Sequence, residues 1–219
     1  RIHRVGKGLK RKNAHDFNPD LTMEEMLGGT RLGSDSHADT TCVNKHAYVQ
    51  TVVEGIMVNA VPFDESIGHV VDLPIVHAIF AYDDPMTSET SLLRFNHSVY
   101  IRDMENSLLC PNQAREFGTI VDDVPQHLDH TGQSTFSIHS EFKSFPFQAH
   151  GPTAYLQVRR PTSEELSTLQ PIDMTDETGW NPYPEDAEFH ACSVAHTTLL
   201  TQHPLDDFLL SQHNRKLAA

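Results

Sequence analysis

The sequence predicts an all-β domain with irregular extensions at both ends. Between Thr30 and about Arg160 most segments are rich in β-branched and aromatic residues, a composition that favours strands. The 219 residues include thirteen prolines and one tryptophan, which indicates many loops. A chain of this length suits one domain with tails.

Five stretches predict the strands of this domain. Residues 48–61 and 69–82 are long apolar or β-branched runs, the first interrupted by Gly55 and the second ended by a turn at "DDP". Residues 91–101 follow as the second arm of a hairpin. Residues 135–142 and 153–160 alternate polar and apolar side chains, as strands with one buried face do.

Short helices are predicted at three places. "TMEE" at 22–25 and "TSEE" at 162–165 have the spacing of a capping box, so helices should follow to about Leu27 and Leu169. A third helix should run from about Asn112 to Phe117, closed by a glycine. Beyond residue 170 the chain is acidic and rich in proline, which predicts irregular structure.

Charge and composition divide the chain into three parts: a basic linker with a short helix (1–27), the β domain (28–160), and a short helix with an acidic, proline-rich tail (161–219). Residues 1–12 hold six of the sixteen basic residues, so the rest carries ten basic against thirty acidic groups, a formal charge of −20. An acidic body is a poor surface for nucleic acid. The basic tail is interpreted either as a disordered linker or as a weak RNA contact. Because the chain begins with Arg1, we expect a piece of a longer precursor.

The cysteines and the hydropathy pattern predict a cytoplasmic protein that does not bind a membrane. The three cysteines are far apart and form no Cys-x-x-Cys pair, which argues against a thiolate zinc site and fits a reducing compartment. No apolar run approaches the roughly 18 residues of a membrane span, and the N-terminus has no apolar signal-peptide core.

The polar stretch "GSDSHADTTC", residues 33–42, is the candidate site, and three interpretations stay open. Asp35, His37 and Asp39 have the alternation by which ureohydrolases of the arginase type hold two manganese ions. That site also needs a second Asp-x-Asp segment, which the chain lacks after Asp39. Alternatively, the side chains only satisfy the backbone of a tight turn.

The third interpretation is aspartic-protease chemistry. It needs two aspartates that share one proton and hold a water between them. One carboxylate takes a proton from the attacking water while the other protonates the peptide carbonyl. The chain has one such loop, so the second aspartate must come from a second copy, and the active site must lie on the axis of a symmetric homodimer.

Two motifs favour the aspartic-protease interpretation. "SDSHADTTC" resembles the Asp-Ser-Gly-Ala loop of retropepsins, and "HSVYIRDMENSLLCPNQAREFG" resembles the "VLYVPxLxxNLLSVxQLxxxG" signature of copia-type retrotransposon proteases. "DLPIVHAIFAYDDP", "VDDVP" and "RRPTSEEL" are similar to segments of the same elements, in the same order, so the resemblance covers about residues 27–182. It implies a retropepsin-like closed β-barrel with one short helix over residues 28–160, a polypeptide substrate, and neither a metal nor an organic cofactor.

The resemblance also implies roles for individual residues. Asp35 would be the catalytic aspartate, and the hydroxyl of Ser36 would bond across the dimer axis. Ala38 would pack behind the loop, and Asp39 with Thr40 would complete the turn. A second set would lie beneath the loop: Leu108 and Leu109 in a strand, and Cys110 where the family has Gly or Ser.

Two points remain open within the resemblance. His37 stands at the glycine of the family loop, so the chain is either an active endopeptidase of a retroelement polyprotein or an inactive dimerisation and spacer module. Apart from the resemblance, a binuclear metal hydrolase that uses Asp35, His37 and Asp39 remains the third possible function, after the active and the inactive module. The flap over the substrate would be the segment 64–68 or the segment 83–90.

Overall fold

The computed structural model describes residues 2–5, 13–60 and 70–182. The chain forms two units, Arg1–Trp180 and Asn181–Ala219. Only Asn181 and Pro182 of the second unit fall within the described residues. The boundaries at 27/28 and 160/161 inferred from composition stay a prediction.

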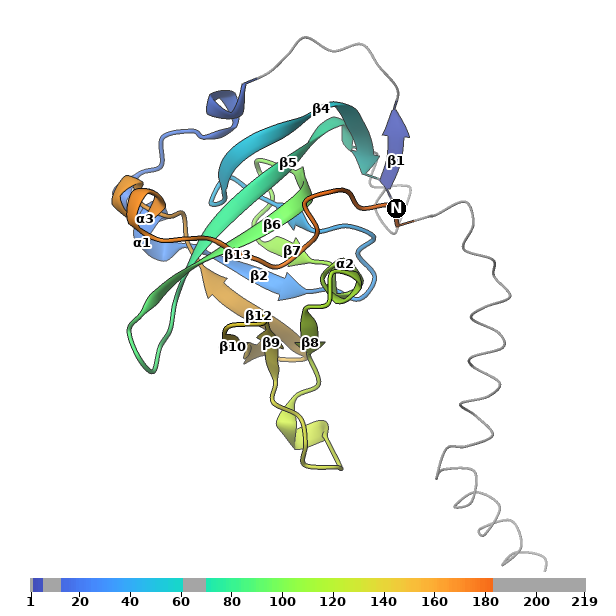
Figure 1. The fold of residues 1–219 in the computed structure, drawn as a ribbon, viewed down its shortest axis with the longest axis vertical. Coiled ribbons are helices and arrows are strands. Elements are labelled where there is room, and N and C mark those ends of the chain that lie inside the picture. The colour runs from blue at the N-terminus through green and yellow to red at the C-terminus, as the bar shows by residue number, and fades with distance from the viewer. Residues whose placement is uncertain (1, 6–12, 61–69, 183–219) are drawn as a thin grey trace, which may run out of the picture. The chain divides into compact units, whose positions relative to one another are not determined.

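A large open sheet dominates the first unit (Figure 1). Its strands follow the order β1-β4-β5-β6-β3-β7-β2-β12-β11, and β13 pairs with β6 beside this path. The strands, in chain order, are β1 (Ile2–Val5), β2 (Thr30–Ser34), β3 (Cys42–Val43), β4 (Tyr48–Ala60), β5 (Val70–Asp83), β6 (Thr90–Tyr100), β7 (Ser107–Leu109), β11 (Gln148–His150), β12 (Thr153–Val158) and β13 (Ile172–Asp173).

The prediction of an all-β domain with a closed barrel is wrong. A barrel requires its two edge strands to pair with each other, but in the part of the chain that the structure describes β1 pairs with β4 and β11 pairs with β12. The sheet is also mixed, because β2–β7, β3–β6 and β13–β6 run parallel. An isolated bridge between Ala81 and Arg159 joins β5 to the chain after β12 without closing the sheet. The fold is therefore a mostly-β member of the α/β class.

A smaller sheet of three strands lies beside the large one: β8 (Ile120–Asp122), β9 (Ser137–His139) and β10 (Ser144–Pro146), in the order β10-β9-β8. The helices are short: η1 (Ala14–Phe17), α1 (Met23–Gly28), α2 (Pro111–Glu116), η3 (Gln126–Leu128) and α3 (Ser163–Thr168). No helix among the described residues is long and apolar enough to cross a membrane.

The centre of the large sheet is buried on both faces. Ile79 to Tyr82 of β5 are all buried, as expected of a strand covered from two sides. Phe80 and Tyr82 belong to the main core, whereas Ile79 and Ala81 pack with Leu166 and Leu169 of the α3 region. Helix α3 thus covers the face opposite the main core.

The two predicted capping boxes are formed. In each, the threonine hydroxyl accepts a bond from the N3 amide and the N3 glutamate bonds the threonine amide, at Thr22 with Glu25 and at Thr162 with Glu165. After α1, Gly29 has φ +61°, and a Cβ there would lie 2.4 Å from the carbonyl of Val158. Only glycine therefore fits this turn into β2 without a shift of the backbone.

Candidate functional site

Strand β2 leads directly into the candidate loop. It runs parallel to β7, with Gly33 beside Leu108 and Ser34 beside Leu109. The amide of Asp35 donates to the carbonyl of Leu109 at 3.0 Å, which extends the ladder by one bond. The structure therefore brings Asp35 next to Leu108 and Leu109, although the segments that hold them are far apart in the sequence.

The loop turns tightly at Asp35. Its Oδ1 accepts the amide of His37 at 2.9 Å, and its carbonyl accepts the amide of Ala38 at 3.1 Å. The first of these bonds makes an Asx turn, in which an aspartate satisfies the backbone two residues on. Ser36 and His37 lie exposed at the apex, with Ser36 Oγ 3.5 Å from His37 Nδ1.

The Asp35 carboxylate is open to solvent. Its side chain is 36 % exposed and that of His37 is 90 % exposed, with His37 Nδ1 3.8 Å from Asp35 Oδ1. Among the contacts of the described residues, the carboxylate accepts the His37 amide at Oδ1 alone, so Oδ2 keeps its capacity to accept hydrogen bonds. The carboxylate can therefore accept a further hydrogen bond at the surface of this unit.

The end of the returning arm is buried, and the residue that follows it, Thr41, is fixed to helix α2. Thr40 and Thr41 are buried, and Thr41 Oγ1 accepts the amide of Cys110 at 3.2 Å. The amide of Thr41 donates to Gln113 Oε1 at 2.9 Å. Cys110 is the N-cap of α2, with its Sγ accepting the Gln113 amide at 3.4 Å. Cys110 thus takes the capping role that a serine hydroxyl would otherwise fill.

Gln113 connects three segments around the site, and the sequence reasoning missed it. It is 2 % exposed, and its Nε2 donates to the carbonyls of Asn96 at 3.1 Å and His97 at 3.3 Å in β6. The signal in the sequence was a glutamine on the first turn of a helix that begins with "CP". A polar side chain in that place often bonds a neighbouring backbone.

Trp180 was also missed. Its Nε1 donates to the carbonyl of Asp39 at 2.8 Å and lies 3.1 Å from the hydroxyl of Thr40. The backbone of Asp39 is therefore held by the last residue of the first unit. The only signal was that the single tryptophan stands in a stretch otherwise typical of a tail.

The two thiols near the loop are not nucleophiles. Burial raises the pKa of Cys42 to about 12, and the neighbouring Cys110 thiol and the negative charges of Asp35 and Asp39 raise it in the same direction. Burial also raises the pKa of Cys110. Both thiols are therefore protonated at neutral pH, and thiolate chemistry is not available to them.

The described residues bring no three His, Cys, Asp or Glu side chains together in a way that could hold a metal ion. Asp35 and His37 lie close to each other, and Asp39 follows on the returning arm. The alternation that suggested a metal cage belongs to a turn rather than to an extended strand.

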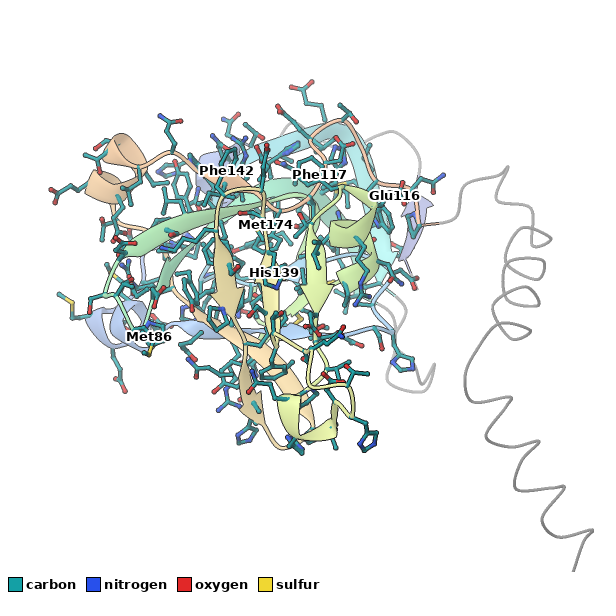
Figure 2. All side chains as sticks on the ribbon, turned by 60° about the horizontal axis from the view of Figure 1, so that its bottom comes forward. Met86, Glu116, Phe117, His139, Phe142 and Met174 are labelled. Atoms are coloured by element: carbon teal, nitrogen blue, oxygen red, sulfur yellow. The ribbon has the colours of Figure 1, made fainter. Side chains whose placement is uncertain are left out.

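One flap candidate lies far from Asp35. Cys42 pairs with Val99 near the end of β6, whereas the turn after Asp83 joins the opposite end of β6 at Thr90. Nine residues of strand separate Thr90 from Val99, roughly 30 Å at about 3.3 Å per residue. Met86 marks the tip of this hairpin at the edge of the molecule (Figure 2).

The other flap candidate, 64–68, lies outside the described residues. Its flanking strands do extend toward the site. Ile75 pairs with Val99, and the strand runs five residues further to Val70, which pairs with Ala60 of β4. The facing ends of β4 and β5 therefore project at the end of β6 where the Asp35 loop lies.

The structure thus places every residue of the predicted site around one loop. Asp35, Ser36 and His37 form the apex, and Ala38, Asp39 and Thr40 form the returning arm. Leu108, Leu109 and Cys110 lie beneath it, between β7 and α2. Comparisons with protein-family models, with curated proteins and with solved structures find no match to this chain.

Proposed function

We propose that the chain is an aspartic endopeptidase of a copia-type retroelement that cleaves its precursor polyprotein as a symmetric homodimer. Asp35 of each subunit would supply one carboxylate of the dyad. The observation that carries this proposal is the solvent-exposed Asp35 carboxylate at the end of β2, fixed to β7 by the bond from its amide to Leu109. A catalytic carboxylate needs such a rigid support and access to substrate.

The dimer follows from the chemistry. An isolated carboxylate can accept a proton from water but cannot also donate one to the peptide carbonyl. Two carboxylates at about 3 Å share one proton and divide these tasks. Ser36 and His37 are exposed at the apex, so no residue that the structure describes covers the point at which a second loop would meet the first.

In the proposed reaction a water lies between the two Asp35 side chains. The ionised carboxylate removes a proton from the water, whose oxygen attacks the peptide carbonyl carbon. The protonated carboxylate gives its proton to the carbonyl oxygen, and a gem-diol forms. The carbon–nitrogen bond then breaks as the amine nitrogen takes a proton from the dyad and one hydroxyl of the gem-diol gives its proton to the dyad. The products are a carboxylic acid and an amine, and the dyad again holds one proton.

Replacing Asp35 with asparagine tests the proposal. We expect cleavage of the precursor, and of a peptide library, to fall at least about 100-fold, because the variant dimer loses both carboxylates of the dyad and with them both acid–base steps. The matched control is Asp103→Asn, since the Asp103 side chain is 93 % exposed and lies outside the loop. Identical processing in Asp35→Asn and parent chains would sink the proposal.

Mixing the two chains tests the dimer itself. If both subunits must supply Asp35, an equal mixture that exchanges freely should keep about a quarter of the parent activity, because only parent homodimers are active. About three quarters of the activity would show instead that one Asp35 per dimer suffices, and about one half would show that each subunit works on its own. A parent chain that forms dimers but cleaves no peptide would favour the inactive dimerisation module.

A further inference from the structure

A segment near the end of the described chain runs along β6 toward the Asp35 loop. We call residues 172–180 the strap. Its first part is β13, which pairs in parallel with β6, with Ile172 beside Leu93 and Asp173 beside Arg94. The amide of Met174 donates to the carbonyl of Arg94 at 2.9 Å, so the pairing continues beyond the strand.

Side chains anchor the strap firmly. Arg94 forms a two-point ion pair with Asp173, with Nε–Oδ1 and Nη2–Oδ2 distances of 2.5 and 2.6 Å. Thr175 is fully buried, and its hydroxyl accepts the Asn96 amide at 2.6 Å and donates to the Asn96 carbonyl at 2.9 Å. Met174 is fully buried among the side chains of the core (Figure 2).

The strap and helix α2 hold the same short arm of the loop. Trp180 Nε1 bonds the carbonyl of Asp39 and lies beside the Thr40 hydroxyl, while Gln113 and the Cys110 amide bond the next residue, Thr41. Asp39 is only four residues from Asp35, so the position of the Asp39 backbone limits the positions that the turn at Asp35 can take. The arm therefore has a fixed point on each side.

We propose that Trp180 is a positioning residue for the Asp35 loop, and that the strap is part of the catalytic unit rather than of a linker. This inference rests on the proposed function. A shared-proton dyad requires its carboxylates to be held to within about half an ångström. The indole N–H supplies that constraint through the backbone of Asp39, without touching the substrate.

Replacing Trp180 with phenylalanine in the full chain removes the N–H donor but keeps an aromatic ring. We expect kcat to fall roughly fivefold with KM unchanged, because a neutral hydrogen bond shifts the occupancy of the positioned loop by about that factor. The control is Thr178→Val on the strap. Thr178 bonds only Asp176 in the contacts described, at 2.7 and 2.8 Å, so this variant should keep the parent kcat.

The single tryptophan also gives a readout that does not depend on activity. The indole N–H of the parent and of the Asp35→Asn chain should exchange with solvent at least about tenfold more slowly than that of an unfolded peptide, because it is bonded inside the fold. Its single NMR resonance reports this rate. Fast exchange in the folded parent chain would overturn the inference even if Trp180→Phe failed to fold.

The two proposals can fail separately. A parent chain that cleaves peptides, with a Trp180→Phe variant of equal kcat, would leave the endopeptidase standing and remove the positioning role. A fall in kcat that Thr178→Val reproduces would also remove it. A parent chain that cleaves nothing would end both proposals, whatever the indole exchange shows.

Discussion

Replacing Gln113 with leucine would test how the Asp35 loop is held to helix α2 and to strand β6. Leucine is close to glutamine in size but has no polar atoms, so the change removes three bonds and leaves little empty space. Gln113 is 2 % exposed, and water cannot easily take its place. The expected cost is therefore that of the backbone groups left without a partner.

The three partners contribute unequally. The Thr41 amide loses its bond to Gln113 Oε1 in a fully buried place, which costs about 1–3 kcal/mol. The carbonyl of His97 loses its bond in a partly buried place, about 0.5–1.5 kcal/mol. The carbonyl of Asn96 keeps the Thr175 hydroxyl as a donor and should contribute little. The sum is about 3 kcal/mol, or a Tm lower by roughly 6–12 °C for a unit of this size.

Urea denaturation and thermal melting of the full chain measure this effect. The control is Asn112→Ala on the same helix turn, where the side chain is exposed and the change in unfolding free energy should stay within about 0.5 kcal/mol. A loss below about 1 kcal/mol for Gln113→Leu would refute the reasoning, because it would mean that the Thr41 amide finds another partner.

Two further predictions concern charge and burial. Hydrogen bonds from Arg159 hold the pKa of Glu165 and of Asp83 below their ordinary values of 4.5 and 3.8. The two ion pairs therefore stabilise the fold fully above the ordinary pKa values, and this stabilisation is lost as the pH falls through the lowered pKa values. Arg159→Gln should accordingly lose less stability than the parent chain when the pH falls below about 4.5. Urea midpoints that fall equally in the parent and the variant would contradict this. Because burial raises the pKa of Cys42 to about 12 and that of Cys110 as well, iodoacetamide at about pH 8 should modify neither thiol until the chain is unfolded. Peptide mass mapping checks this, and modification of Cys42 in the folded chain would disprove it.

Local signals in the sequence predicted individual elements well. The runs at 48–61, 69–82 and 91–101 became β4, β5 and β6, because β-branched and aromatic side chains fit a pleated, half-buried surface wherever that surface lies. The capping boxes marked the starts of α1 and α3 because the bonds involved span only three residues.

The order of the strands was not predictable in the same way. The acidic, proline-rich composition from residue 170 predicted irregular chain, yet Ile172 and Asp173 pair with β6. The Arg94–Asp173 ion pair accompanies that pairing and joins residues 79 positions apart. The bond from Trp180 to Asp39 spans 141 positions. No periodicity within either segment encodes such a contact. For the same reason the closed barrel, inferred from motifs alone, was wrong.

Cys110 and His37 both differ from the protease motifs that the sequence resembles, and the two differences have different structural consequences. Cys110 is buried as the cap of α2, so its replacement by a bulkier residue would disturb the fold. His37 is not among the described non-glycine residues with positive φ, and its side chain is 90 % exposed. The turn at Asp35 therefore does not require glycine at position 37 within one subunit. A glycine there would matter only for the approach of a second loop, where a missing Cβ lets two backbones come close. In the proposed dimer, the effect of His37 would therefore fall on the contact between the two loops and not on the fold of the subunit. The mixed-dimer experiment with Asp35→Asn measures activity at that same proposed contact.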